Sequence, residues 1–222
     1  MPSAKCLRAL FGFFTILPVR AELDFSCAWA LPYTVAPVIG GVAALVMRAA
    51  GSLPAYLTLL ALTGLNHLDG LADTADALMV RDRERARAAL EDPRRGTAGI
   101  FAVVISVLFA TAYLKSPVQL IAAEVFSKAV AVVFAAFSQA FKEGLGSAYI
   151  NSVKRRWPLA VPALALLAYF FPAATATALT ASLLLYYAAY KHLGGANGDV
   201  LGYLLEVSRT AFITLFYINI KM

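Results

Sequence analysis

The chain has 222 residues, of which 61% are hydrophobic and only 14% are charged, and its formal net charge is +6. Soluble domains carry about 25% charged residues, so this composition excludes an ordinary soluble domain and is typical of a membrane protein. We therefore expect a single all-α transmembrane domain over residues 1–222, a polytopic helical bundle surrounded by membrane lipid, with no nucleic-acid partner.

The first 20 residues, "MPSAKCLRALFGFFTILPVR", have the basic start and short apolar run of a signal peptide. Pro18 and Arg20 stand where small residues should precede a cleavage site, so we expect this segment to be retained. Cys6 and Cys27 have no metal-ligand spacing, and we interpret both as small apolar residues rather than as a disulfide or a zinc site.

Apolar runs near the roughly 20 residues needed to cross a bilayer recur along the chain. They predict about six to seven transmembrane helices. The candidate spans are residues 31–50, 53–68, 98–114, 117–141, 157–172, 173–190 and 209–221.

The basic residues test this topology, because they concentrate in loops on the cytoplasmic side. If the chain begins inside, the long polar stretches 66–97, 142–156 and 191–208 share that side. Of the 19 Lys and Arg residues, all lie in the N-terminal segment, in these stretches or at Arg209, except for Arg48, Lys115, Lys128 and Lys221. The pattern predicts a multi-pass protein of the cell membrane whose active site faces the cytoplasm.

The polar stretch "LNHLDGLADTADALM", residues 65–79, contains an acidic stripe. Asn66, Asp69, Asp73 and Asp76 are spaced by three, four and three residues, which places them on one face of a helix. A divalent cation relieves the repulsion among clustered carboxylates, and oxygen ligands suit Mg²⁺ or Mn²⁺ with a shared substrate phosphate. The plainer interpretation is a solvated helix end with Asp69 capping a turn.

A second motif, "EDPRRGTAG", precedes another apolar helix. Free amides and the positive dipole at the start of a helix suit an anion, and arginine binds phosphate bidentately. We expect Arg94, Arg95, Gly96 and Thr97 to bind phosphate. The four arginines of residues 81–87 are expected instead to satisfy the positive-inside pattern and to contact anionic lipid.

A third motif, "LGGANGDVLG", is too rich in glycine for an uninterrupted helix. It predicts a turn that approaches a ligand closely, with Asp199 completing a metal shell or accepting guanine donors, or else a plain connector. Within the span 117–141, Glu124 and Lys128 lie one helical turn apart. They are either a structural pair or the lining of a polar cavity.

Together, "GLNHLDGLADTADAL", "RARAALEDPRRGTAGIFAV" and "LGGANGDVLGYLLE", with the amino-terminal "FFTILPV", resemble the adenosylcobinamide-GDP ribazoletransferase family, also called cobalamin synthase. The blocks occur in family order over nearly the whole chain. The resemblance implies an integral membrane enzyme that needs magnesium. It implies that adenosylcobinamide-GDP is joined to α-ribazole or its 5′-phosphate and that GMP is released.

The resemblance also implies roles for the motif residues. Asp69, Gly70, Asp73 and Asp76 match the family's acidic motif, and His67 matches its preceding histidine. Asp92, Arg94, Gly96 and Thr97 match the second motif, and Gly194, Gly195, Gly198 and Asp199 match the third. The expected catalytic residues are His67, Asp69, Asp73 and Asp76. The expected metal ligands are Asp69, Asp73, Asp76 and Asp199. The expected substrate contacts are the residues of the second and third motifs, including Asp199, with Asn66, Arg95 and Asn197. Asn197 departs from the family's usual threonine, and Lys128 stands where an arginine is expected.

Such a reaction depends mainly on positioning and charge neutralisation. A ribose hydroxyl attacks phosphorus, and a neighbouring carboxylate or His67 takes its proton. Other classes with related features are UbiA-type prenyltransferases, CDP-alcohol phosphotransferases and, among non-enzymes, ion-coupled transporters. A homo-oligomer is compatible with the sequence.

Overall fold

The computed structural model describes residues 3–221, with side chains described up to residue 219. These residues are 77% helical, and no β-strand occurs among them, so the predicted all-helical class is confirmed. The α-helices are α1 (Ala4–Phe14), α2 (Val35–Ala50), α3 (Ser52–Leu62), α4 (Asn66–Leu78), α5 (Arg83–Ala89), α6 (Thr97–Tyr113), α7 (Pro117–Ala136), α8 (Leu145–Val153), α9 (Val161–Phe170), α10 (Pro172–Leu193) and α11 (Gly198–Lys221). Two 3₁₀ helices cover Ala28–Tyr33 and Trp157–Ala160.

Within residues 3–221, three helical segments are long and apolar enough to cross a membrane, which is the property expected of a helical membrane protein. They are Ala28–Ala50, Pro117–Ala136 and Gly198–Asn219. Shorter apolar helices cover Ser52–Leu62, Thr97–Tyr113 and Trp157–Phe170. Together these six segments correspond to all the predicted spans except 173–190, which forms part of α10.

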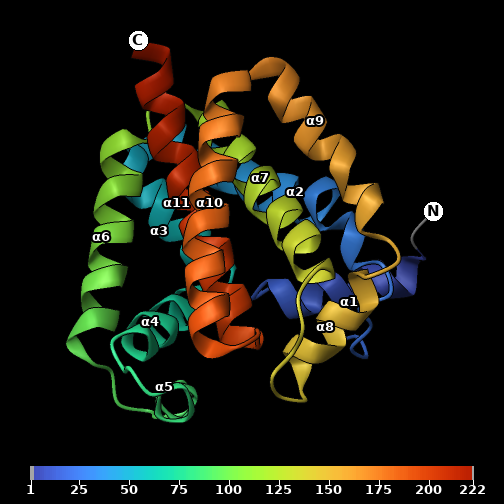
Figure 1. Ribbon diagram of the computed structural model, residues 1–222. Helices are drawn as coiled ribbons and strands as arrows, with labels where there is room; N and C mark the ends of the chain where they lie inside the picture. The colour runs from blue at the N-terminus through green and yellow to red at the C-terminus, as the bar shows by residue number, and fades with distance from the viewer. Residues whose placement is uncertain (1–2, 222) are drawn as a thin grey trace.

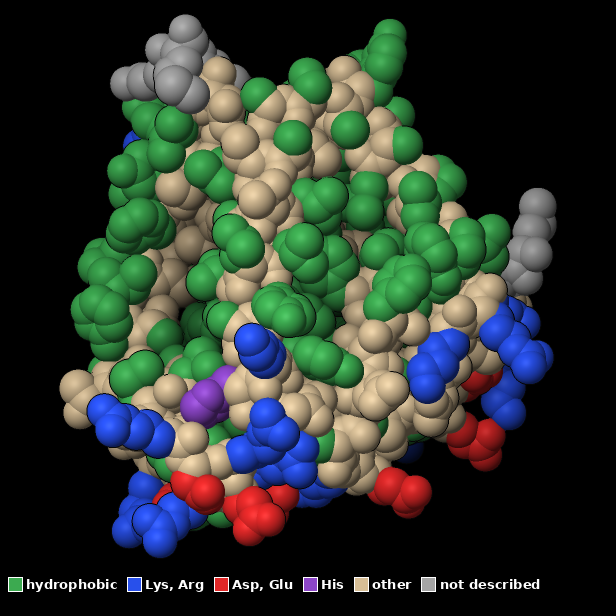
Figure 2. Space-filling model, viewed as in Figure 1, with side chains coloured by type: hydrophobic (Ala, Val, Ile, Leu, Met, Phe, Trp, Pro, Cys, Tyr) green, Lys and Arg blue, Asp and Glu red, His purple; other side chains and the backbone are tan. Residues whose placement is uncertain are grey.

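The polar helices gather at one end of the bundle. Figure 1 shows α4, α5 and α8 at the end opposite the C-terminus, below the long helices α6, α10 and α11. Figure 2, in the same view, shows Lys, Arg, Asp and Glu side chains gathered at this end, with hydrophobic side chains over most of the remaining face. The polar stretches 66–97 and 142–156 and the start of the stretch 191–208 therefore share one end, as the charge pattern predicts, whereas residues 198–208 run into the bundle as part of α11.

The chain turns sharply where the sequence predicts one continuous span over residues 53–68. Helix α3 ends at Leu62, and Gly64 and Leu65 have positive φ angles of 69° and 61°. Glycine adopts this left-handed conformation readily, whereas a leucine pays a steric cost of roughly 1–2 kcal/mol. Because of this turn, α4 begins at Asn66 and runs along the polar end.

The last span begins earlier than predicted. Helix α11 starts at Gly198 rather than at residue 209, so Arg209 lies inside a membrane-length helix and not in a cytoplasmic loop. Glu206 lies in the same helix, so acidic residues occur within the membrane-length helices α7 and α11 alike. Both Arg209 and Glu206 are fully buried. The prediction failed because two charges within four residues resemble a loop in hydropathy.

The interpretation of the two cysteines as unpaired is wrong. Cys6 of α1 and Cys27, 21 residues later, form a disulfide with Cα atoms 6.1 Å apart. The intervening chain folds back, and Phe25 packs against Phe13 and Phe14 with ring centroids 5.0 and 6.3 Å apart. This packing brings the cysteines together, and spacing along the sequence does not reveal it.

Candidate active site

The acidic stripe on α4 faces an arginine from the second motif. Arg95, in the loop before α6, donates from Nη1 to Asp73 Oδ1 and from Nη2 to Asp69 Oδ1. Four residues separate the two aspartates, so one helical face presents both carboxylates to the same guanidinium. The structure thus joins the first and second motifs through two charge-assisted contacts.

Asp73 is the more enclosed of the two carboxylates, with its side chain 8% exposed against 57% for Asp69. Its pKa is raised to about 6. Burial is the main cause; Arg95 acts in the opposite direction, and the negative charges of Asp69 and Asp199 raise the pKa further. The site therefore holds more negative charge than Arg95 alone balances.

Asp199 reaches this site from the first turn of α11. Its backbone packs directly on α4: a β-carbon at Gly70 would lie 2.6 Å from the Asp199 carbonyl oxygen. Asn197 holds the carboxylate, because its Nδ2 donates to Asp199 Oδ2 at 2.7 Å while its Oδ1 accepts from Val200 N at 3.0 Å. The asparagine that departs from the family pattern therefore caps α11 and orients Asp199.

Asp76 faces the start of α6 instead. Its two carboxylate oxygens accept from Gly96 N at 2.7 Å and from Gly99 N at 2.8 Å. A β-carbon at either glycine would collide with this carboxylate. The N-terminal amides expected to bind a substrate phosphate, next to Thr97, are thus engaged by a side chain of the protein itself.

Arg94 and Arg95 have different environments. The Arg94 side chain is 88% exposed and pairs with Asp92, Nη2 lying 2.7 Å from Oδ2. Hydrogen bonds from the Arg94 side chain and backbone lower the pKa of Asp92 to about 2. Of the two arginines, Arg95 is therefore the one brought to the acidic stripe.

Helix α5, which precedes the second motif, is hydrogen-bonded to the end of α10, which leads into the third motif. Arg83 donates from Nε to the His192 carbonyl at 3.1 Å, and Arg87 donates from Nε to the Leu193 carbonyl at 2.8 Å. These carbonyls end α10, whose C-cap is Gly194 in the left-handed region, with φ of 69°. Both arginines thus cap a helix, a role different from the lipid contact expected of them.

Further contacts close this end of the molecule. Ala196 N donates to the Gln139 carbonyl at 2.9 Å, beside Gly195, and Lys142 pairs with Glu91 at 2.5 Å. The loop after α7, the segment after α5 and the glycine turn that leads to Gly198 are therefore joined. The structure brings all three sequence motifs together at one end.

Asn66 and His67 line a cavity of about 360 Å³ together with Asp199, and Asn66 also lines a groove beside Asp69 and Arg95. His67 is buried, and its pKa lies well below the usual value. Burial is the main cause, and the positive charges of Lys128 and Arg209 act in the same direction. Its imidazole is therefore neutral at pH 7.

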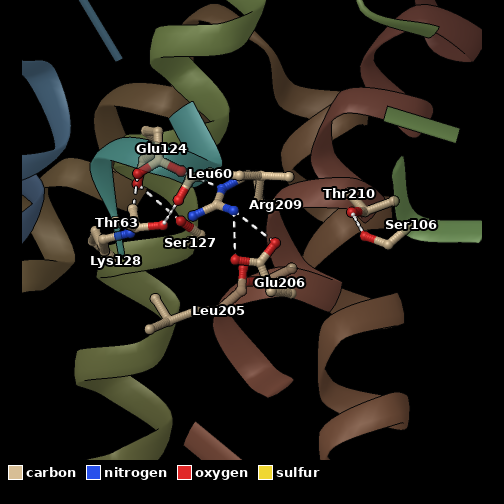
Figure 3. Close-up of polar contacts among 11 residues, drawn as sticks. Leu60, Thr63, Ser106, Glu124, Ser127, Lys128, Leu205, Glu206, Arg209 and Thr210 are labelled. Carbon is tan, nitrogen blue, oxygen red and sulfur yellow. Dashed lines mark hydrogen bonds and ion pairs between the residues drawn. The ribbon is translucent and has the colours of Figure 1, made fainter. Parts of the chain in front are cut away.

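Glu124 and Lys128 belong to a closed network of four charges between α7 and α11 (Figure 3). Lys128 Nζ lies 3.0 Å from Glu124 Oε2, and Arg209 Nη1 lies 2.6 Å from Glu206 Oε1. Arg209 Nε also donates to Glu124, so the two pairs form one unit. All four side chains are fully buried, which supports structural pairing. Glu206 was not predicted as a buried charge, and Arg209 was expected on the cytoplasmic side; their spacing of three within an apolar run is the signal that reveals the pair.

The acidic side chains suit a magnesium ion, although they do not form a complete ligand shell. In the part of the chain that the structure describes, no three His, Cys, Asp or Glu side chains are arranged to hold one metal ion. Magnesium commonly binds through one or two carboxylates together with waters and substrate phosphates. Asp69 and Asp73, with Asp199 nearby and one arginine between them, meet this requirement in donor chemistry and in charge.

Comparison with known proteins identifies the family. Residues 6–217 match the family described as Cobalamin-5-phosphate synthase. A protein of Pyrobaculum calidifontis named adenosylcobinamide-GDP ribazoletransferase is 62% identical over 96% of this chain and 99% of its own length. Proteins of the same name from Pyrobaculum aerophilum and Pyrococcus abyssi are 59% and 33% identical, each over 94% of this chain and over 94% and 96% of their own lengths. No solved structure matches the chain significantly. The chain is therefore a transferase enzyme and belongs to the cobalamin-5-phosphate synthase family.

Proposed function

We propose that this protein joins adenosylcobinamide-GDP to α-ribazole or its 5′-phosphate in a magnesium-dependent reaction that releases GMP. The proposal places the reaction at the polar end of the bundle, on the cytoplasmic side of the cell membrane. It is supported by the names of the relatives, which span nearly the same length, and by the chemistry of the site.

The observation that carries the proposal is the contact of Arg95 with both Asp69 and Asp73. These contacts place one guanidinium and two carboxylates, the groups that bind phosphate and metal ions, at the same point of the molecule. The same guanidinium geometry fits two oxygens of a diphosphate. When bound, a magnesium ion would be held by Asp69 and Asp73, with Asp199 in reach, and would neutralise charge on the diphosphate and the leaving GMP.

The transfer forms one bond to phosphorus and breaks another, and side chains of the site can accept the released proton. A ribose hydroxyl of the acceptor forms a bond to the phosphorus next to the aminopropanol, and the bond from this phosphorus to the bridging oxygen breaks. GMP leaves with that oxygen. The hydroxyl proton passes to a carboxylate of the stripe or to His67, whose neutral imidazole can accept it. Arg95 stabilises the charge that develops on the phosphate oxygens.

An assay of GMP release with purified protein, adenosylcobinamide-GDP and α-ribazole tests this function. We expect release with magnesium and none after chelation. Asp73→Asn should lower the rate by roughly 100-fold, because a fixed charge at the reacting group is lost while volume is kept. Glu84→Gln, an exposed carboxylate on α5, is the matched control and should react normally. GMP release that is independent of magnesium and of Asp73 would refute the proposal.

A further inference from the structure

Aromatic rings line much of the cavity that borders Asn66, His67 and Asp199. Phe13 and Phe14 come from α1, Phe25 from the following segment, and Tyr149 from α8. The cavity volume of about 360 Å³ falls within the range of small-molecule sites. Aromatic walls of this kind suit a flat aromatic ligand, since rings stack or meet edge to face.

These rings support one another. Phe14 and Phe25 each contact Tyr149, with centroids 6.1 and 5.7 Å apart, and Phe14 lies 6.2 Å from the His67 ring. The disulfide between Cys6 and Cys27 ties α1 to the segment that carries Phe25. The disulfide therefore links two of the three segments that build the wall, which favours a preformed site.

Two polar atoms in this aromatic wall lack a partner. Tyr149 and His67 are both buried, and neither the Tyr149 hydroxyl nor His67 Nδ1 has a hydrogen-bond partner among the residues that the structure describes. Buried polar atoms in proteins are nearly always paired. The Tyr149 hydroxyl stays protonated at neutral pH because burial raises its pKa. A ligand atom that accepts a hydrogen bond would satisfy it.

The cavity is continuous with the acidic site. Asn66 and Asp199 line it at one side, and Asp199 packs on α4 beside Asp69. A molecule whose flat ring fills the cavity would therefore present its polar portion to the carboxylates. A separate groove, lined by Asp69 and Arg95, lies on the α6 side of the stripe and leaves room for a second substrate.

We infer that the aromatic cavity binds the planar nitrogen-heteroaromatic base of the acceptor nucleoside, with a bare ring nitrogen accepting from the Tyr149 hydroxyl and the sugar directed toward Asp199. This assignment rests on the proposed function, which requires a nucleoside acceptor beside the diphosphate. A lipid chain would fill the same volume but would leave both polar atoms unpaired. A heteroaromatic base satisfies at least one of them.

Binding of two matched probes tests the assignment without catalysis. Benzimidazole has a bare ring nitrogen, whereas indole has the same shape and only an N–H donor. Titration calorimetry of the purified protein, without magnesium or nucleotide, should show benzimidazole binding about tenfold more tightly than indole, the gain expected for one hydrogen bond to a buried donor. In Tyr149→Phe this preference should disappear, with indole affinity unchanged.

Tyr203→Phe is the control. Tyr203 has the same 6% exposure as Tyr149 but lines a different groove, between α6 and α11. The control should keep the wild-type preference. Equal binding of the two probes to the wild-type protein, or a preference that survives Tyr149→Phe, would overturn the assignment.

Kinetics separate this assignment from the proposed function. In the GMP-release assay, Tyr149→Phe should raise KM for the nucleoside about tenfold and leave KM for the GDP-activated substrate unchanged. GMP release with an unchanged nucleoside KM would refute the base site and leave the function intact. Tyr149-dependent benzimidazole binding in a protein that never releases GMP would refute the function and leave the binding site.

Discussion

The two neighbouring arginines of the second motif could not be told apart from the sequence, but they have different partners in the structure. Arg94 is exposed and pairs locally with Asp92, whereas Arg95 contacts Asp69 and Asp73. We predict that Arg95→Ala lowers GDP affinity in the presence of magnesium by roughly 10- to 100-fold, the value of a charge-assisted contact. Arg94→Ala should leave it within about twofold. Calorimetric titration of GDP measures both, and an equal loss in the two variants would contradict the separation of roles.

Asp76 provides a second contrast within the stripe. Asp76→Asn keeps only one acceptor oxygen for the two amides of Gly96 and Gly99, so we expect it to reduce the free energy of unfolding by about 1–2 kcal/mol. Asp69→Asn, on a half-exposed side chain, should change it by less than about 0.5 kcal/mol. Thermal unfolding without magnesium compares them. If Asp76→Asn unfolds like the wild type but no longer binds magnesium, Asp76 is a ligand and not a cap.

These contrasts mark what residue spacing can predict. The intervals in "DGLADTAD" place Asp69 and Asp73 on one face, and Arg95 bridges them. The partner of Asp76 depends on where the chain returns after an intervening helix, which no interval within the motif encodes. The same holds for Tyr149, which lies outside every motif and reaches the cavity only through folding.

The contact between α4 and α11 depends on one glycine. A β-carbon at Gly70 would meet the backbone of Asp199, which cannot move aside as a flexible side chain can. We predict that Gly70→Ala lowers the free energy of unfolding by about 1–3 kcal/mol and displaces Asp199 from the site. Gly41→Ala on α2 is the control, since a β-carbon there would meet no described atom within 4 Å. It should stabilise the helix by about 0.5–1 kcal/mol. Unfolding in detergent measures both, and tolerance of Gly70→Ala would exclude tight packing.

Helices were predictable where the hydrophobic runs are uninterrupted, as in α6 and α7. The predicted helix ends are wrong at two positions, for different reasons. Gly64 and Leu65 turn the chain inside an apolar run, which hydropathy cannot detect. Glu206 and Arg209 lower the hydropathy of the sequence, so this part of α11 resembles a loop. The helix continues through them because the two charges neutralise each other.

The disulfide fixes the amino-terminal segment against the rest of the bundle. Closing a loop of this length restricts the unfolded chain and contributes about 3 kcal/mol in the chain-entropy description. We expect Cys6→Ser, Cys27→Ser and the double variant to lose similar stability, and a reductant to lower the melting temperature of the wild type only. Thiol counting before and after reduction provides the control. A wild-type melting temperature that does not respond to reductant would show that the bond is not stabilising.

The charged end of the bundle predicts its orientation in the membrane. In a cysteine-free background, Ala88→Cys on α5 should resist a membrane-impermeant thiol reagent added to intact cells, because α5 lies at the basic end. Lys115→Cys, between α6 and α7, should react, since it is exposed and α6 leads away from that end. The reverse labelling pattern would place the active site outside. The gathering of charge at one end was predictable from the positions of the basic residues along the sequence, whereas the disulfide required the folded chain.

The four buried charges also bear on how the protein enters the membrane. Helix α7 carries Glu124 and Lys128 one turn apart, and α11 carries Glu206 and Arg209, so each helix has no net charge from its own pair. A lone charge at the centre of a bilayer costs roughly 2.5–3.5 kcal/mol during translocon insertion. Each helix can therefore be inserted as a neutral segment without waiting for the other. We expect the ion pair between Arg209 and Glu124 to form after both helices have been inserted. It would then stabilise the packing of α7 against α11 and would not be required for insertion.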